Sequence, residues 1–176
     1  INKREKQTMP LPSVSIEAIP LKLKLKTTIR HAAATRNEGE SVWVRATRNG
    51  HSGYGEGCPR VYVAGDELES GITWIKENFS AGKADFGNLS DLKHWIERNS
   101  PAIDRYPSAW CAVEMALLDL LSREKGCNVE KLLGLDGRTL FGRYTAVLGD
   151  DKKWKYTSLA DKYLIRGLSD FTIKLN

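Results

Sequence analysis

The stretch SVWVRATRNGHSGYGEG, residues 41–57, decides how the first part of the chain folds. Its first seven residues have the β-branched and aromatic content of a strand. Asn49-Gly50 then matches a two-residue hairpin turn, in which both central residues need a positive φ. Gly53, Gly55 and Gly57 alternate with larger residues, which predicts a strand whose one face lets another backbone approach closely. A phosphate-binding loop would need a helix directly after the glycines, whereas Pro59 and an extended stretch follow.

The residues before this hairpin predict one more strand of an antiparallel meander. Apolar residues alternate with polar ones at positions 14, 16 and 18, and again at positions 21, 23 and 25. The apolar phase changes at Pro20, which predicts a bulge or bend there. Residues 27–39, around Arg30 and His31, are polar and are expected to form a loop. Residues 1–12 are expected to be a disordered lead.

Helical spacing of apolar residues after residue 65 predicts a helical bundle. Asp66 is expected to cap a helix that reaches Phe79, and Pro101 is expected to end a second helix. The strongest helix runs from Ser108 to about Lys125. Its apolar face is formed by Trp110, Val113, Leu117 and Leu121, broadened by Met115 and Leu118. Residues 13–140 therefore predict an α+β domain in which a three-stranded meander precedes the bundle.

The pattern changes near residue 140. Residues 143–148 and 171–175 are expected to be strands, and residues 154–166 a helix between them. This order predicts a βαβ unit and a parallel sheet. A parallel sheet of two strands cannot cover its own faces. We therefore expect the chain to be incomplete at its C-terminus, with residues 141–176 joining an oligomer or a missing part of the fold.

Composition excludes several classes of function. The net charge is +5, but seven of the 27 Lys and Arg lie within residues 1–30, and the rest of the chain is balanced. That distribution does not predict a nucleic-acid surface. No apolar run is long enough to cross a bilayer, and the charged residues 1–8, with no apolar stretch after them, are not expected to be a secretory signal. The three cysteines lack metal-site or disulfide spacing, which favours reduced thiols and a cytoplasmic protein.

Two charged residues lie in apolar surroundings. Asp119, inside the strongest helix, is expected to be a structural hydrogen-bonding group. Lys174 alternates with Phe171 and Ile173 on the last strand. It would be either an inward group at a barrel mouth or an exposed residue near the chain end. In the first position it could act as a general base if burial or a nearby cation lowered its pKa.

The order of these segments resembles the enolase superfamily, in its mandelate racemase and muconate-lactonising branch, and most of all dipeptide epimerases. The resemblance covers residues 14–176. It rests on seven segments in the family's order, at residues 25–30, 40–45, 53–59, 64–67, 112–119, 131–134 and 171–175. It implies a capping domain up to about residue 140, followed by the first strands of a modified TIM barrel. The family abstracts a proton α to a carboxylate and stabilises the enediolate on Mg²⁺.

The resemblance also implies roles for particular residues. Lys174 matches the second lysine of the family's Lys-x-Lys motif, which acts as the acid/base on one face of the substrate. Thr172 stands where the first lysine is common. Residues 27–39 match the first specificity loop of the cap, and Arg30 falls where dipeptide epimerases have an arginine near the substrate. We expect Lys174 to be catalytic, and Arg30, His31 and Thr172 to bind substrate.

The family's metal-binding carboxylates and its opposing acid/base lie on later barrel strands, so none is expected within this chain. The resemblance thus implies the N-terminal part of a Mg²⁺-dependent isomerase of small-molecule carboxylates, similar to dipeptide epimerases and inactive as residues 1–176 alone. A cycloisomerase or an o-succinylbenzoate synthase-like lyase is the enzymatic alternative. A stand-alone binding module with the capping fold is the alternative from another class.

Overall fold

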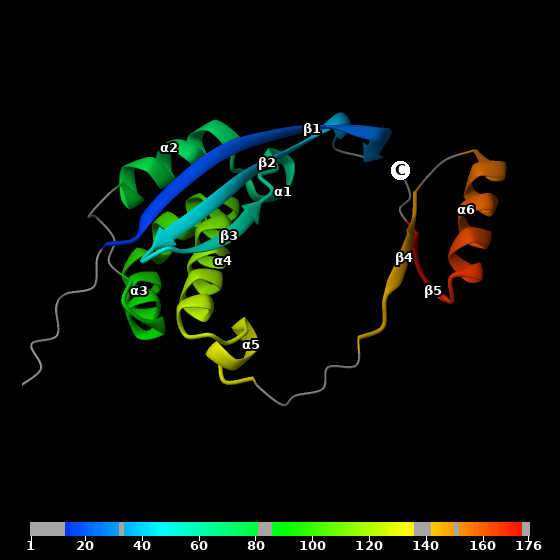
Figure 1. The fold of residues 1–176 in the computed structure, drawn as a ribbon. Helices are drawn as coiled ribbons and strands as arrows, with labels where there is room; N and C mark the ends of the chain where they lie inside the picture. Colours follow the sequence, from blue (N-terminus) through cyan, green and yellow to red (C-terminus); the bar gives the residue numbers. More distant parts are fainter. Residues whose placement is uncertain (1–12, 32–33, 81–85, 136–141, 150–151, 174–176) are drawn as a thin grey trace, which may run out of the picture. The chain divides into compact units, whose positions relative to one another are not determined.

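A computed structural model describes residues 13–31, 34–80, 86–135, 142–149 and 152–173 (Figure 1). The chain divides into two compact units. The first comprises residues 1–22 and 40–136, and the second comprises residues 23–39 and 137–176. The lead predicted for residues 1–12 lies outside the described residues.

A three-stranded sheet with the order β1-β2-β3 confirms the meander. Its strands are β1 (Ser15–His31), β2 (Ala34–Arg48) and β3 (His51–Gly57). β2 and β3 pair antiparallel in the register Val44↔Gly55 and Arg48↔His51. Asn49 and Gly50 connect them with φ values of 50° and 78°, as the predicted two-residue turn requires.

The prediction of a loop at residues 27–39 is wrong for the described residues, because β1 continues to His31 and β2 begins at Ala34. An antiparallel ribbon accepts polar side chains where they are exposed, as at Lys24, Lys26 and Asn37. Thr28 Oγ1 donates a hydrogen bond to Asn37 Oδ1 at 2.6 Å, which joins the two strands in this region. β1 also continues through Pro20 without interruption. It is an edge strand, where a residue without an N–H is tolerated.

Five helices of the first unit follow the sheet: α1 (Val61–Ala64), α2 (Leu68–Phe79), α3 (Leu89–Arg105), α4 (Pro107–Glu124) and α5 (Val129–Leu132). The strongest predicted helix is confirmed as α4. The expectation that Pro101 ends a helix is wrong, because it lies inside α3. A proline there costs about 3 kcal/mol. The helix begins with a capping box between Asn88 and Asp91, and its Leu92 is buried in the core.

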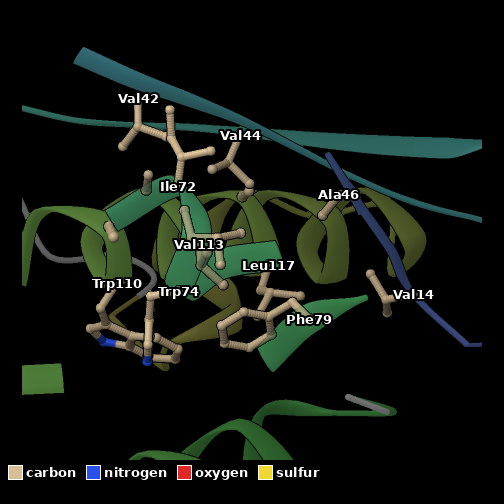
Figure 2. Close-up of a cluster of buried hydrophobic side chains, with 14 of the residues drawn as sticks. Val14, Val42, Val44, Ala46, Ile72, Trp74, Phe79, Trp110, Val113 and Leu117 are labelled. Carbon is tan, nitrogen blue, oxygen red and sulfur yellow. The ribbon is translucent and has the colours of Figure 1, made fainter. Parts of the chain in front are cut away.

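The core of the first unit lies between the sheet and the helices (Figure 2). Val42, Val44 and Ala46 of β2 face Val113 and Leu117 of α4, which confirms the predicted apolar face of α4. Aromatic rings extend the core, and those of Trp95 and Trp110 stack with centroids 4.7 Å apart. Met115 does not belong to this face. It lies on the flank of α4 and is 48% exposed.

The second unit contains β4 (Thr145–Leu148), α6 (Lys153–Ile165) and β5 (Asp170–Ile173). β4 and β5 pair in parallel, which confirms the predicted strand–helix–strand unit with a parallel sheet. That these strands begin a barrel remains a prediction. Within the described ranges, none of the helices combines the length and apolar character that crossing a bilayer requires.

Candidate functional site

The β4–β5 pair has two chemically different faces. Ala146 and Leu148 of β4 are buried, whereas Val147 between them is 46% exposed. In a parallel pair, partnered residues share a face. The partnering Val147↔Thr172 therefore places Thr172 on the exposed face, opposite the buried pair. Asp170 lies on the Thr172 face as well, and its Oδ1 accepts a hydrogen bond from Arg143 Nη2 at 2.8 Å.

The four site residues expected from the sequence differ in what the structure says of them. Thr172 is exposed on β5. Lys174 lies outside the described residues, so its orientation stays a prediction. Arg30 and His31 are the last residues of β1, which places them on a strand rather than in a loop. Their side chains are outside the described part of the structure, and their role in binding substrate is untested.

Among the described residues of the Thr172 face, no set of ligands for Mg²⁺ is brought together. Mg²⁺ prefers oxygen ligands in octahedral geometry. Asp170 supplies the carboxylate on this face, and it is already paired with Arg143. Across the described part of the chain, no group of three or more His, Cys, Asp or Glu is placed to hold a metal ion.

The first unit is built around a close contact between β3 and α4. A Cβ added to Gly53, Gly55 or Gly57 would lie 1.8–2.2 Å from a backbone atom of α4. The prediction that these glycines permit a close backbone approach is therefore confirmed. Asp119 supports the contact, because its Oδ2 accepts from Tyr54 N at 3.0 Å and its Oδ1 accepts from Arg123 Nε at 2.8 Å. Its predicted structural role is confirmed.

Residues 58–65, which carry α1, are held at both ends. Arg60 Nη1 donates to the Glu40 carbonyl at 2.8 Å and also to the Pro59 carbonyl. At the other end, Asp66 is 3% exposed, and its Oδ2 accepts from Ser108 N at 2.9 Å. Asp66 therefore caps α4 and not the adjacent α2, whose N-cap is Glu67 without a side-chain bond. The predicted local cap is wrong because the carboxylate reaches a helix start 42 residues away.

A buried ion pair ties the β2–β3 hairpin to the end of α4. Arg48 donates from Nε and Nη2 to the two carboxylate oxygens of Glu124 at 2.9 and 2.7 Å, and from Nη1 to the Phe86 carbonyl. The hydrogen bonds to Arg48 lower the pKa of the Glu124 carboxyl. A cavity of about 280 Å³ opens beside the pair, but the guanidinium and the carboxylate are engaged with each other.

Cys111 and Glu114, both on α4, have raised pKa values. Burial raises the pKa of the Glu114 carboxyl, against a hydrogen bond with Trp110 that lowers it. Burial also raises the pKa of the Cys111 thiol, and the neighbouring Glu114 and Cys58 add to that effect. Sequence reasoning did not single out Cys111 or Glu114 as sites. The sequence carries no motif that would have marked them, because the three cysteines lack metal-site and disulfide spacing.

Known proteins with sequences similar to this chain show which family it belongs to. No family model matches the chain. An L-Ala-D/L-Glu epimerase from Bacillus subtilis is 32% identical over 165 residues, which are 90% of this chain and 42% of that protein. The chain belongs to the enolase superfamily. An L-Ala-D/L-Glu epimerase from Francisella tularensis subsp. novicida is 33% identical over 121 residues, 68% of this chain and 33% of that protein. The resemblance seen in the sequence is confirmed.

Solved structures of enolase-superfamily enzymes agree with this result. A muconate lactonizing enzyme from Mycobacterium smegmatis gives a TM-score of 0.78 at 24% identity, covering 95% of this chain and 44% of that one. A dipeptide epimerase from Methylococcus capsulatus, complexed with Mg and the dipeptide L-Arg-D-Lys, gives 0.76 at 19% identity, covering 93% and 46%. At these identities the match shows the fold. The chain spans about a third to two fifths of the length of the curated superfamily relatives cited above.

Proposed function

We propose that this chain is the N-terminal portion of an enolase-superfamily isomerase that epimerises a dipeptide at the carbon α to a carboxylate. The observation that carries the proposal is the 32% identity to the Bacillus subtilis L-Ala-D/L-Glu epimerase, which runs through 90% of this chain. The segment order on which it rests, an antiparallel meander, a helical layer and then a parallel βαβ unit, is the order of the described elements. The residues that bind Mg²⁺ in such an enzyme would be other than the described ones.

In this proposal, residues 13–140 form the capping domain and residues 141–176 begin the barrel. The exposed apolar side chains of the βαβ unit support a barrel start, because they need a covering surface. On α6, Trp154 is 67% exposed, Leu164 53% and Ile165 85%. Further strands and helices of the parent protein would cover them. Alternatively, a second copy of the chain would cover these apolar side chains.

Lys174 is the proposed base. Thr172 lies on the face opposite the buried residues Ala146 and Leu148. If the alternation of β5 continued beyond Ile173, Lys174 would share the face of Thr172. In TIM barrels, the catalytic residues lie at the C-terminal ends of the strands and point toward the barrel axis. An amine there would take the α-proton when its pKa is lowered toward neutrality. Thr172 would contact the substrate beside it, and Arg30 and His31 would bind the substrate from the cap.

The test is solvent deuterium exchange into the α-carbon of L-Ala-L-Glu and L-Ala-D-Glu, catalysed by the full-length protein that contains residues 1–176. Lys174→Ala should lower the exchange rate by a factor of about 10² to 10⁴, the usual contribution of general acid–base catalysis. Lys174→Arg should not restore it, because a guanidinium does not deprotonate. Lys162→Ala on α6 is the control and should leave the rate unchanged.

Residues 1–176 alone are expected to show no exchange under the same conditions. Exchange by Lys174→Ala close to the wild-type rate would show that Lys174 is not the base. No exchange with any dipeptide by the full-length protein would overturn the epimerase assignment.

A cycloisomerase is the second candidate, favoured by the TM-score of 0.78 to the muconate lactonizing enzyme. The curated sequence relatives cited above are dipeptide epimerases, which is why we place the epimerase first. Conversion of muconate to muconolactone by the full-length protein, without dipeptide exchange, would reverse that order.

A further inference from the structure

Two exposed thiols lie beside the contact between β3 and α4. Cys58 directly follows β3, and Cys111 lies on α4. The proposed epimerase chemistry uses neither of them, so a role for these thiols is independent of that function. The third cysteine, Cys127, lies after the end of α4 and is partly buried.

The packing of β3 against α4 places the two cysteines at about the same position along the axis of α4. Gly53 contacts the backbone of Ala116, Gly55 that of Ala112, and Gly57 that of Ser108, so the strand and the helix run antiparallel. Tyr54 N donates to Asp119 Oδ2, and Asp119 follows Cys111 by about two turns of α4. From Tyr54 to Gly57, the last residue of β3, the strand rises about 10 Å, and Cys58 is the next residue. From Asp119 back to Cys111 the helix rises about 12 Å.

The segment that begins with Cys58 also ends at this end of α4. Asp66 Oδ2 accepts from Ser108 N, one helical turn before Cys111. The Cβ position of Gly57 lies against the Ser108 carbonyl and 3.4 Å from Ala112 Cβ. Both ends of residues 58–66 therefore meet α4 within one turn of Cys111.

We propose that Cys58 and Cys111 form a redox-active thiol pair that closes to a disulfide by exchange with a small disulfide such as oxidised glutathione. The closed form would fasten the Cys58 end of the α1 segment to α4, as Asp66 already fastens the other end.

The exchange takes place in two steps. The Cys58 thiolate attacks one sulfur of glutathione disulfide, the S–S bond of that molecule breaks, and glutathione thiolate leaves and takes a proton from water. Cys111 then loses its proton to water and attacks Cys58 Sγ, the bond between Cys58 and the second glutathione breaks, and that glutathione leaves as a thiolate that takes a proton from water. Two protein thiols are oxidised by two electrons, and one glutathione disulfide is reduced to two glutathione molecules.

The surroundings of Cys111 make it the less readily ionised thiol and so leave the first attack to Cys58. Burial and the Glu114 carboxylate raise the pKa of its thiol, so Cys111 ionises less readily than a free cysteine. Its Sγ donates to Met115 Sδ at 3.8 Å, which orients the thiol on this flank of α4. The same neighbourhood includes Cys58, whose thiolate charge acts on Cys111.

The experiment exposes the folded chain to oxidised glutathione, blocks the remaining thiols with iodoacetamide, and maps the peptides by mass spectrometry without reduction. The wild-type chain and Cys127→Ser should lose the Cys58 and Cys111 thiols together and give one linked peptide. Cys111→Ser should accumulate a glutathione adduct on Cys58. Dithiothreitol should restore both thiols, and amide exchange of residues 58–66 should be slower in the oxidised form.

Other outcomes would overturn the pair. Independent glutathione adducts on Cys58 and Cys111 without a linked peptide would show that the thiols do not meet. Linkage to Cys127 would place the reactive pair elsewhere, and no reaction at either thiol would rule out exchange. The same linkage with equal yield in denaturing urea would show that the fold does not select it.

Discussion

Replacing Gly55 by alanine should break the contact on which the first unit is built. The new Cβ would lie 2.0 Å from the Ala112 carbonyl oxygen, 2.8 Å from Ala116 N and 2.9 Å from Met115 Cβ. The first two atoms are backbone, so no rotamer change removes the clash. In other strand positions this substitution is stabilising or neutral, because glycine weakens a strand. Here we expect the opposite sign.

The size of the effect follows from the distance that α4 must move. Relief of the clash requires a shift of roughly 1 Å, and a gap of that size forfeits a quarter to a half of the dispersion energy of each contact it opens. The contacts at risk include Val113 and Leu117, both 0% exposed. We therefore expect a loss of about 3 kcal/mol, the upper end for overpacking. Total stabilities of 5–15 kcal/mol make that loss easy to measure.

Urea denaturation followed by tryptophan fluorescence measures the change, since Trp74 and Trp110 are each 6% exposed in this core. Gly142→Ala is the matched control, because a Cβ there meets nothing within 4 Å. Its effect should stay within about 0.5 kcal/mol. Adding Ala112→Gly to Gly55→Ala should not restore stability, because the atom that is struck is a carbonyl oxygen. Equal stability of Gly55→Ala and Gly142→Ala would refute the reasoning.

Two further predictions concern the ends of α4. Asp66→Ala should cost about 1 kcal/mol through loss of the cap at Ser108 N, with faster amide exchange in the first turn of α4, and Asp66→Asn should cost less because it keeps an acceptor. A change confined to α2 would contradict the cap assignment. Because Arg48 lowers the pKa of Glu124, the stabilisation by this pair is present above the unfolded pKa of about 4.3 and is lost as the pH falls through the folded value. Glu124→Gln should lower the free energy of unfolding at pH 7 and should make it depend less on pH below about pH 5. Urea denaturation at a series of pH values measures this, and the same pH dependence in the variant and the wild type would contradict a contribution from the pair.

Local chemistry was enough to predict the elements whose causes are local. The turn at Asn49-Gly50 was predicted because both residues must adopt positive φ, and the structure gives 50° and 78°. The alternating glycines predicted a close approach because a residue without Cβ has few other reasons to recur on one face. α4 was predicted from its spacing, and Pro107 lies at its first turn as expected.

The wrong predictions concern elements decided by distant residues. Asp66 was assigned to the next helix because a cap is usually a neighbour, yet its carboxylate bonds to Ser108. Residues 27–39 were expected to form a loop because they are polar, whereas a strand pairing decides their backbone. Pro101 was expected to end a helix, but α3 continues through it to Arg105 because of tertiary packing. The candidate site depends on Lys174 and on the Arg30 and His31 side chains. The sequence suggested them only through the family resemblance, and the structure adds that Arg30 and His31 belong to β1.

The antiparallel seating of β3 on α4 has a consequence for synthesis on the ribosome. β3 is complete at Gly57, but the helix that covers its glycine face is complete only at Glu124. At about 5–20 residues per second, the uncovered meander waits roughly 3–13 s for its partner. During that interval a nearly bare backbone surface and an open strand edge face solvent or a chaperone. The nascent chain is therefore most exposed to misassociation between the emergence of residue 57 and that of residue 124.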